Sequence, residues 1–259
     1  MPLAFEDAGS GTAVVLLHGF PLDRTLWDAQ KQALSRRYHV ITPDLPGHGQ
    51  SPRLPDPPTI DGMADAVNDL LDTNGVTRPV VLGGLSMGGY VALSFASRHH
   101  ERLRALMLFD TKSAADTPEA AAGRERSARA IDASGSIDNL IDAMVPKLFA
   151  ESTRTARPAL LSATERLMRS TDPASVSAAL RAMAVRADRT AELTRITVPC
   201  LVCAGEQDAI SPPEEMREIA RRLPNGRFVS IPDAGHLTPI ENPEAVTEAI
   251  EAFLAGLDD

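Results

Sequence analysis

Apolar residues along this chain fall into short continuous runs that alternate with segments of helical spacing. The continuous runs are typical of parallel strands that are covered on both faces. The other segments repeat apolar residues every three or four positions, which gives each helix one face for a core. The predicted strands are residues 13–17, 38–42, 80–83, 103–109, 198–204 and 227–231, and the predicted helices are residues 27–36, 60–73, 87–97, 213–222 and 243–254. This alternation predicts an open, mostly parallel sheet with helices on both sides.

The alternation stops between residues 111 and 190, where no strand pattern occurs and the apolar spacing is helical. We therefore expect an α/β core made of residues 1–110 and 191–259, with a helical cap inserted at residues 111–190. An insert at this point lies over the carboxyl ends of the strands, where open α/β sheets bind their ligands.

Composition narrows the class of protein. With 43% hydrophobic and 24% charged residues the chain has the make-up of a globular protein. Its net charge of −9 argues against nucleic acid or an anionic membrane as the main partner. The sequence starts without the features of a signal peptide, and no apolar run approaches the roughly 18 residues of a membrane span. We expect a cytoplasmic protein whose partner is a small molecule.

The two cysteines, Cys200 and Cys203, form a C-x-x-C pattern that invites a redox or metal interpretation. Both lie within one predicted buried strand, and positions three apart in a strand point to opposite faces. No second cysteine pair or nearby histidine completes a set of zinc ligands. We interpret them as buried structural thiols and predict no metal site.

The most informative motif surrounds Ser86. An apolar strand pattern runs into Gly84-Leu85-Ser86-Met87-Gly88, and a helical pattern follows at once. A serine at such a junction occupies a very tight strand-to-helix turn, and the glycines avoid collisions that a Cβ would cause. The sequence therefore predicts a nucleophile elbow with Ser86 at its tip.

A serine nucleophile needs a base. The strongest candidate is His236, which follows the last predicted strand in Gly235-His236 and so lies at the same sheet edge as Ser86. The other histidines have simpler explanations at helix ends, strand starts or turns; they are His18, His39, His48, His99 and His100.

An acid must orient that base. Asp208 comes directly after the strand at residues 198–204, and the chain order Ser86, Asp208, His236 is the order expected of this arrangement. Asp110 also ends a strand at this edge and is the alternative acid. We favour Asp208 and interpret Asp110 as a cap for the turn into the insert.

Two backbone N–H groups are the predicted oxyanion hole. The Met87 N–H lies at the N-terminus of the helix that follows the elbow, where unpaired donors favour an anion. The Phe20 N–H follows His18-Gly19 in the loop after the first strand. Pro21 restricts the backbone of Phe20, and His18 is interpreted as a brace for the loop.

Together these motifs resemble the α/β-hydrolase fold superfamily over nearly the whole chain. The motifs that carry the resemblance are His18-Gly19, the loop at residues 43–51, the elbow at residues 84–89, residues 205–208 and Gly235-His236. The resemblance implies an eight-stranded sheet, a helical cap after the sixth strand, an early edge strand at residues 5–7 and no cofactor. The chain is most similar to small microbial carboxylesterases, 3-oxoadipate enol-lactonase-like enzymes and cofactor-free haloperoxidase-like esterases. Halide or epoxide chemistry is not expected, since relatives with those activities have an aspartate in place of Ser86.

The sequence thus predicts a serine hydrolase that cleaves a small carboxylic ester or lactone through an acyl-enzyme. The insert is expected to select the substrate, with an apolar lining or, equally, an internal core formed by Met144, Leu148, Leu167 and Met183.

Three alternatives stay open at this point. The same catalytic groups serve C–C bond hydrolysis, thioester cleavage and acyl transfer. The fold also occurs in ligand receptors. Finally, Pro21 lacks an N–H and can orient its own carbonyl toward the cleft, where it would accept a hydrogen bond from peroxide and favour perhydrolase activity.

Overall fold

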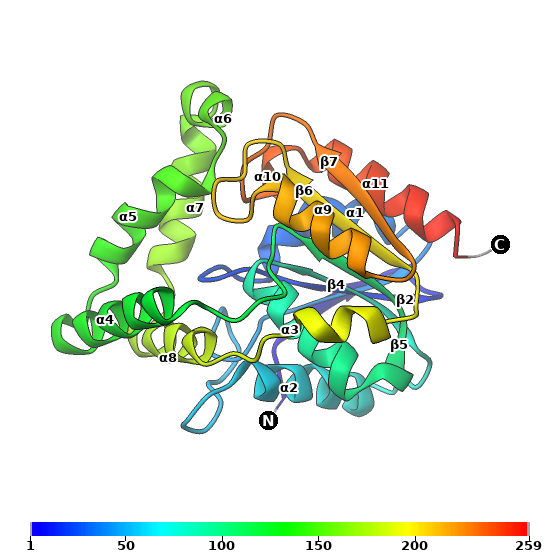
Figure 1. The fold of residues 1–259 in the computed structure, drawn as a ribbon, viewed down its shortest axis with the longest axis horizontal. Helices are drawn as coiled ribbons and strands as arrows, with labels where there is room; N and C mark the ends of the chain where they lie inside the picture. The colour runs from blue at the N-terminus through cyan, green and yellow to red at the C-terminus, as the bar shows by residue number, and fades with distance from the viewer. Residues whose placement is uncertain (1, 258–259) are drawn as a thin grey trace.

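Seven strands form a single sheet that is covered by helices on both faces, with a group of further helices standing off one edge (Figure 1). The computed structural model describes residues 2–257. The strands are β1 (Phe5–Ala8), β2 (Ala13–Leu17), β3 (His39–Pro43), β4 (Val80–Leu85), β5 (Leu103–Phe109), β6 (Cys200–Gly205) and β7 (Gly226–Ile231). The α-helices are α1 (Asp28–Leu34), α2 (Ile60–Thr73), α3 (Met87–Arg98), α4 (Pro118–Ser134), α5 (Asp138–Leu148), α6 (Glu151–Ala156), α7 (Pro158–Arg169), α8 (Pro173–Ala184), α9 (Pro213–Arg222), α10 (Thr238–Glu241) and α11 (Pro243–Ala255). The 3-10 helices are η1 (Arg24–Trp27), η2 (His100–Arg102) and η3 (Thr190–Arg195).

The strand order is β1-β3-β2-β4-β5-β6-β7, and only β1 runs antiparallel to its neighbour. In the register of the central strands, Gly84 lies opposite Leu17 on one side and Leu108 on the other. The carboxyl ends of β2, β4 and β5 therefore reach the same level, and the loops that follow them meet at one edge.

The expectation of eight strands is wrong for residues 2–257, which form seven. The early edge strand is present as β1. Just before β1, the backbone of Ala4 pairs with a loop and not with another strand. The Ala4 N–H donates to Ser51 Oγ, and the Ala4 carbonyl accepts the Asp44 N–H. In this count the cap follows the fifth strand.

The continuous apolar runs are the centre of the core. Every residue of β2, β4 and β6 is buried, as expected for parallel strands with helices on both faces. Helices α1 and α11 pack together, as do α2 and α3 on the other face. Within residues 2–257, no helix is both long and apolar enough to cross a membrane.

Helices α4–α8 form the cap, and their loops are attached to the carboxyl edge of the sheet (Figure 1). The Leu148 carbonyl at the end of α5 accepts the N–H of His236, 2.9 Å away. The Thr171 hydroxyl before α8 donates to the Pro21 carbonyl at 3.2 Å. The cap thus contacts the loops after β2 and β7, which carry predicted site residues.

Candidate active site

Ser86 stands alone between the end of β4 and the start of α3, with backbone angles φ 53° and ψ −112°. A positive φ is uncommon for any residue but glycine and persists only when the surroundings impose it. Here the Ser86 N–H donates to the Phe109 carbonyl at 2.9 Å, and its carbonyl accepts from the Thr111 hydroxyl at 2.7 Å. The end of β5 therefore holds the serine in its turn.

The glycines beside Ser86 are required by close packing. A Cβ on Gly84 would lie 2.2 Å from the Gly88 oxygen, and one on Gly88 would lie 2.5 Å from the Leu17 oxygen. These are collisions with backbone, which cannot move aside. Only glycine at both positions lets β4, α3 and β2 approach closely enough to form the elbow.

The predicted triad residues form a continuous hydrogen-bonded chain. Ser86 Oγ lies 2.9 Å from His236 Nε2, and His236 Nδ1 lies 2.8 Å from Asp208 Oδ2. The other carboxylate oxygen of Asp208 accepts the N–H groups of Ile210 at 2.7 Å and Ser211 at 3.0 Å. In the tautomer whose hydrogen is on Nδ1, the ring donates to Asp208, and Nε2 is the atom that can accept the Ser86 hydroxyl.

The surroundings of Asp208 favour the charged form of its carboxyl. Burial acts to raise the pKa of its carboxyl, but the charge and hydrogen bond of His236 and the two backbone N–H groups outweigh burial, so that the pKa is lowered. A carboxylate at this position stabilises an imidazolium on His236.

The alternative acid, Asp110, has different partners. Its carboxyl accepts from the Gly205 N–H at 2.8 Å and from the Thr238 hydroxyl, and it makes no hydrogen bond to His236. Complete burial, followed by the negative charge of Asp208, raises the pKa of Asp110 well above its usual range. Asp110 joins the ends of β5 and β6 to α10.

The predicted oxyanion donors belong to two segments that lie next to Ser86. A Cβ on Gly19 would be 3.5 Å from Ser86 Cβ, so the loop with Phe20 touches the elbow. Met87 is the first residue of α3. Among the described residues, neither the Phe20 nor the Met87 N–H has a hydrogen-bond acceptor.

His18 braces this loop as the sequence predicted. Its Nε2 accepts the Leu45 N–H at 2.8 Å, which leaves the hydrogen on Nδ1 for donation to the Gly19 carbonyl at 2.9 Å. The Pro21 carbonyl accepts a hydrogen bond from the Thr171 hydroxyl of the cap.

Comparison with known proteins identifies the family to which this fold belongs. The sequence model of the protein family described as alpha/beta hydrolase fold matches residues 12–243. The chain belongs to the α/β hydrolase fold family. A thermophilic esterase from Thermogutta terrifontis, solved with malate bound, is 46% identical, with 98% of this chain and 93% of that chain aligned at a TM-score of 0.96.

Two further relatives act on esters or lactones, to judge by their names. The enol-lactonase from Burkholderia xenovorans LB400 is 30% identical over 98% of this chain and 96% of its own, with a TM-score of 0.90. A pimeloyl-[acyl-carrier protein] methyl ester esterase from Chromobacterium violaceum is 30% identical over 98% of each chain. The predicted similarity to esterases and enol-lactonases is thereby confirmed.

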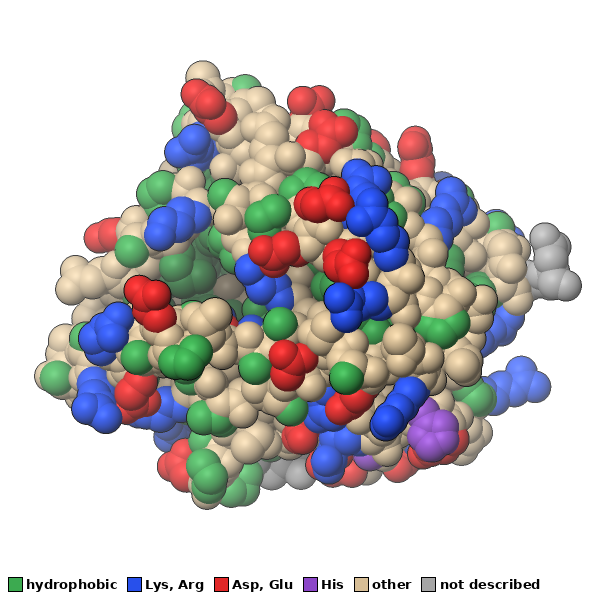
Figure 2. Space-filling model, viewed as in Figure 1, with side chains coloured by type: hydrophobic (Ala, Val, Ile, Leu, Met, Phe, Trp, Pro, Cys, Tyr) green, Lys and Arg blue, Asp and Glu red, His purple; other side chains and the backbone are tan. Residues whose placement is uncertain are grey.

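The four cap residues that were candidates for a substrate lining differ in how deeply they are buried. Leu148 and Met183 are buried, and Met183 Sδ accepts a hydrogen bond from Arg124 of α4. Met144 and Leu167 are partly buried on the neighbouring helices α5 and α7. Figure 2 shows the surface hollowed between the cap and the core, with hydrophobic side chains gathered in the hollow.

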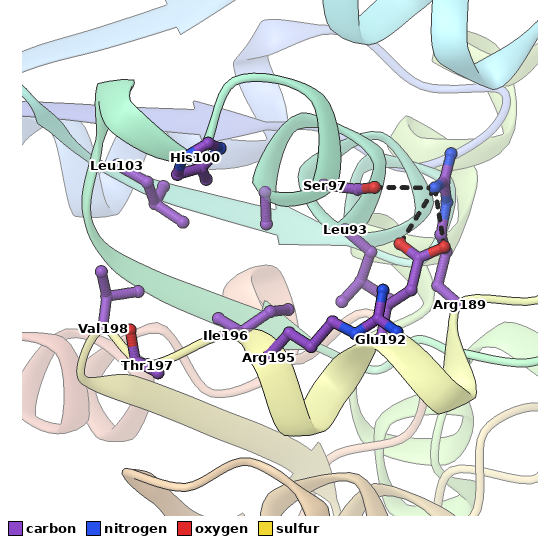
Figure 3. A pocket seen from close by; sticks show the side chains of 11 residues that line it. Leu93, Ser97, His100, Leu103, Arg189, Glu192, Arg195, Ile196, Thr197 and Val198 are labelled. Atoms are coloured by element: carbon purple, nitrogen blue, oxygen red, sulfur yellow. Dashed lines mark hydrogen bonds and ion pairs between the residues drawn. The ribbon is translucent and has the colours of Figure 1, made fainter.

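A separate pocket of about 340 Å³ lies at the opposite edge of the sheet (Figure 3). It is bounded by the end of α3, the residues that start β5 and those before β6, and it contains no predicted catalytic residue. Among its polar groups, Arg189 pairs with Ser97 and Glu192. This pocket therefore has no catalytic arrangement.

Sequence reasoning missed one buried acidic residue beside His236. Glu241 is only 6% exposed, and its carboxylate accepts N–H groups from the loop of His236 and from the cap. The available signal was a glutamate that directly follows the mostly apolar residues 237–240 and comes two residues before Pro243. No group of His, Cys, Asp or Glu within residues 2–257 is arranged to hold a metal ion.

Proposed function

We propose that this protein is a serine hydrolase that cleaves small carboxylic esters or lactones through an acyl-enzyme. The observation that carries the proposal is the hydrogen-bonded chain from Ser86 through His236 to Asp208. It is supported by the backbone N–H groups of Phe20 and Met87, which have no acceptor among the described residues and would serve as the donors that acyl transfer requires.

In the first half of the reaction Ser86 becomes acylated. His236 Nε2 takes the hydroxyl proton as Ser86 Oγ attacks the substrate carbonyl, and Asp208 stabilises the imidazolium that forms. The carbonyl oxygen becomes negative and receives the N–H groups of Phe20 and Met87. The tetrahedral intermediate then collapses, and the alcohol leaves with the proton from His236.

In the second half water replaces the alcohol. His236 takes a proton from water as the water oxygen attacks the acyl carbonyl, and the same two N–H groups stabilise the negative oxygen. Collapse breaks the bond to Ser86 Oγ, which recovers its proton from His236. An ester gives an acid and an alcohol, whereas a lactone gives one hydroxy acid.

The substrate class rests on the relatives and on the cap. The esterase and the enol-lactonase named above align with nearly all of this chain, cap included. The apolar hollow between cap and core suits an acyl or alcohol group of low polarity (Figure 2). The Pro21 carbonyl accepts a hydrogen bond from the Thr171 hydroxyl, which ties it to the cap.

Turnover of p-nitrophenyl acetate, p-nitrophenyl butyrate and a small lactone tests the proposal. We expect the wild type to hydrolyse them and Ser86→Ala to lose at least about 10³-fold in kcat/KM, as expected for removal of a nucleophile. Ser97→Ala, on the exposed end of the same helix, is the matched control and should keep wild-type rates. A wild type without turnover on any ester or lactone would contradict the proposal, as would an active Ser86→Ala.

A further inference from the structure

Three consecutive backbone N–H groups around the catalytic base are held by acceptors tied to the cap. The N–H groups of Gly235 and Leu237 donate to Glu241 Oε1 at 2.9 and 3.3 Å. The His236 N–H between them donates to the Leu148 carbonyl at 2.9 Å. The position of the imidazole therefore depends on contacts that lie outside the triad.

Glu241 also binds the cap directly. Its second carboxylate oxygen, Oε2, accepts the Ala150 N–H at 2.8 Å, at the junction of α5 and α6. Its backbone carbonyl accepts from Arg157 at 2.8 Å. One buried side chain thus joins the histidine loop to the cap through both of its oxygens.

The loop of His236 packs tightly against the junction of α5 and α6. A Cβ on Gly235 would lie 2.6 Å from the Ala150 nitrogen and 2.8 Å from the Phe149 carbonyl carbon. The cap backbone at residues 148–150 therefore lies directly against the loop of His236. A displacement of the cap at this point would move the histidine.

We propose that Glu241 is a positioning residue that couples the cap to the catalytic base. It touches neither the substrate nor the reacting atoms, and it acts by holding the backbone on both sides of His236 in register with the α5–α6 junction. The inference rests on the proposed function, since it assigns His236 as the base. Its consequence is that the seating of the cap sets the efficiency of proton transfer between Ser86 and His236.

The physical reason is the strictness of proton-transfer geometry. A misplacement of about 1 Å costs on the order of 10²-fold in rate. Buried N–H groups that lose their acceptor pay the full cost of desolvation, so the loop would shift to satisfy them. Glutamine at position 241 has one acceptor oxygen and an amide that can only donate, so it cannot serve N–H groups on both sides.

The test compares Glu241→Gln with Glu248→Gln, a control on the exposed face of α11. Active sites are counted by mass after exhaustive labelling with a fluorophosphonate, and kcat is expressed per labelled site. We expect Glu241→Gln to lower kcat per site on p-nitrophenyl acetate by about tenfold or more. KM should stay within about twofold, because acylation and deacylation both use His236 and slow together. A wild-type kcat per site in a folded Glu241→Gln protein would overturn the inference.

A second variant approaches the same contact from the cap. Ala150→Pro removes the N–H that Glu241 accepts, and the native angle φ of −55° suits a proline ring. We expect its kcat per site to fall as well, and the double variant to fall by less than the product of the two single effects. If Glu241→Gln does not fold, Ala150→Pro alone decides: unchanged kcat per site overturns the inference.

Proteolysis provides a readout without catalysis. The junction is flanked by exposed Lys147 and by Arg154 of α6. Trypsin should cleave there several-fold faster in Glu241→Gln than in wild type or Glu248→Gln, and equal cleavage rates would refute the tether. A wild type that hydrolyses no ester would instead refute the proposed function, which separates the two failures.

Discussion

Two buried aspartates near His236 show how position decides the role of a side chain. The carboxylate of Asp208 is hydrogen-bonded to His236 and to two backbone N–H groups, so its pKa is lowered despite burial. Asp110, buried completely and close to the charge of Asp208, has its pKa raised well above the usual range. Asp208 is therefore suited to carry a charge, and Asp110 is suited to act as a neutral hydrogen-bonding group.

Replacing each aspartate by asparagine separates these roles. Asp208→Asn should keep the fold and lower kcat by about 10⁴-fold, because the imidazole loses the partner that fixes its tautomer. Asp110→Asn should keep kcat within about threefold, since the amide oxygen can accept the Gly205 N–H and the amide NH2 can donate to the Thr238 hydroxyl once that hydroxyl rotates to accept. Steady-state kinetics on p-nitrophenyl acetate checks both. Near-wild-type turnover in Asp208→Asn together with collapse in Asp110→Asn would show that the acid is assigned to the wrong residue.

At the level of elements, the loop after β2 depends on buried neutral histidines. Burial lowers the pKa of His18 to about 4, and burial together with the charge of His18 lowers the pKa of His48 to about 3. Their rings lie 5.2 Å apart, and His48 packs edge-on against Phe20. Protonating His18 would turn its Nε2 from an acceptor into a donor facing the Leu45 N–H.

These shifts predict acid sensitivity. Between pH 6.5 and about 4 the unfolded chain binds protons at these histidines that the folded protein does not. The free energy of unfolding should therefore fall as the pH falls through this window, by about 3 kcal/mol for His18 alone at pH 4. Urea unfolding at a series of pH values measures the effect.

A substitution at His48 isolates its share. His48→Asn keeps a donor for the Pro46 carbonyl, which His48 Nδ1 contacts at 3.1 Å, but it does not titrate in this range. Its unfolding free energy should change less between pH 6.5 and 4 than that of wild type. His100→Asn, whose ring is 82% exposed and far from the loop, is the control. Identical pH dependence in wild type and His48→Asn would remove His48 from the account.

At the scale of the whole molecule, local patterns predicted the elements but not the contacts between distant ones. Continuous apolar runs located the strands from β2 to β7, and the helix predicted at 213–222 has the bounds of α9. The sequence also named Ser86, His236 and Asp208, because each follows a strand at one edge. The absence of an eighth strand could not be predicted in this way. The backbone of Ala4 pairs with Ser51 and Asp44 of a loop, and this pairing forms only in the folded protein.

Contacts across the cap were equally hidden from sequence. The side chain of Leu148 was predicted to line the pocket or to join the core of the insert, and nothing predicted that its backbone carbonyl accepts the His236 N–H. Thr171 and Glu241 are not part of any periodic pattern. Thr171 acts through one hydrogen bond to Pro21, and the Glu241 carboxylate accepts the N–H of Ala150, and both partners lie far away along the chain. Such pairings depend on how the cap seats on the core, which a one-dimensional pattern does not encode.

The central claim is that Ser86 carries the acyl group during turnover. The most direct measurement is to mix the protein with excess p-nitrophenyl acetate, quench it in acid within the first turnovers, and locate the acetyl group by peptide mass spectrometry. We predict acetylation on Ser86, none on this residue's peptide in Ser86→Ala, and slower labelling in Asp208→Asn. Rapid ester turnover with Ser86 unlabelled, or with the acetyl group on another residue, would contradict the account.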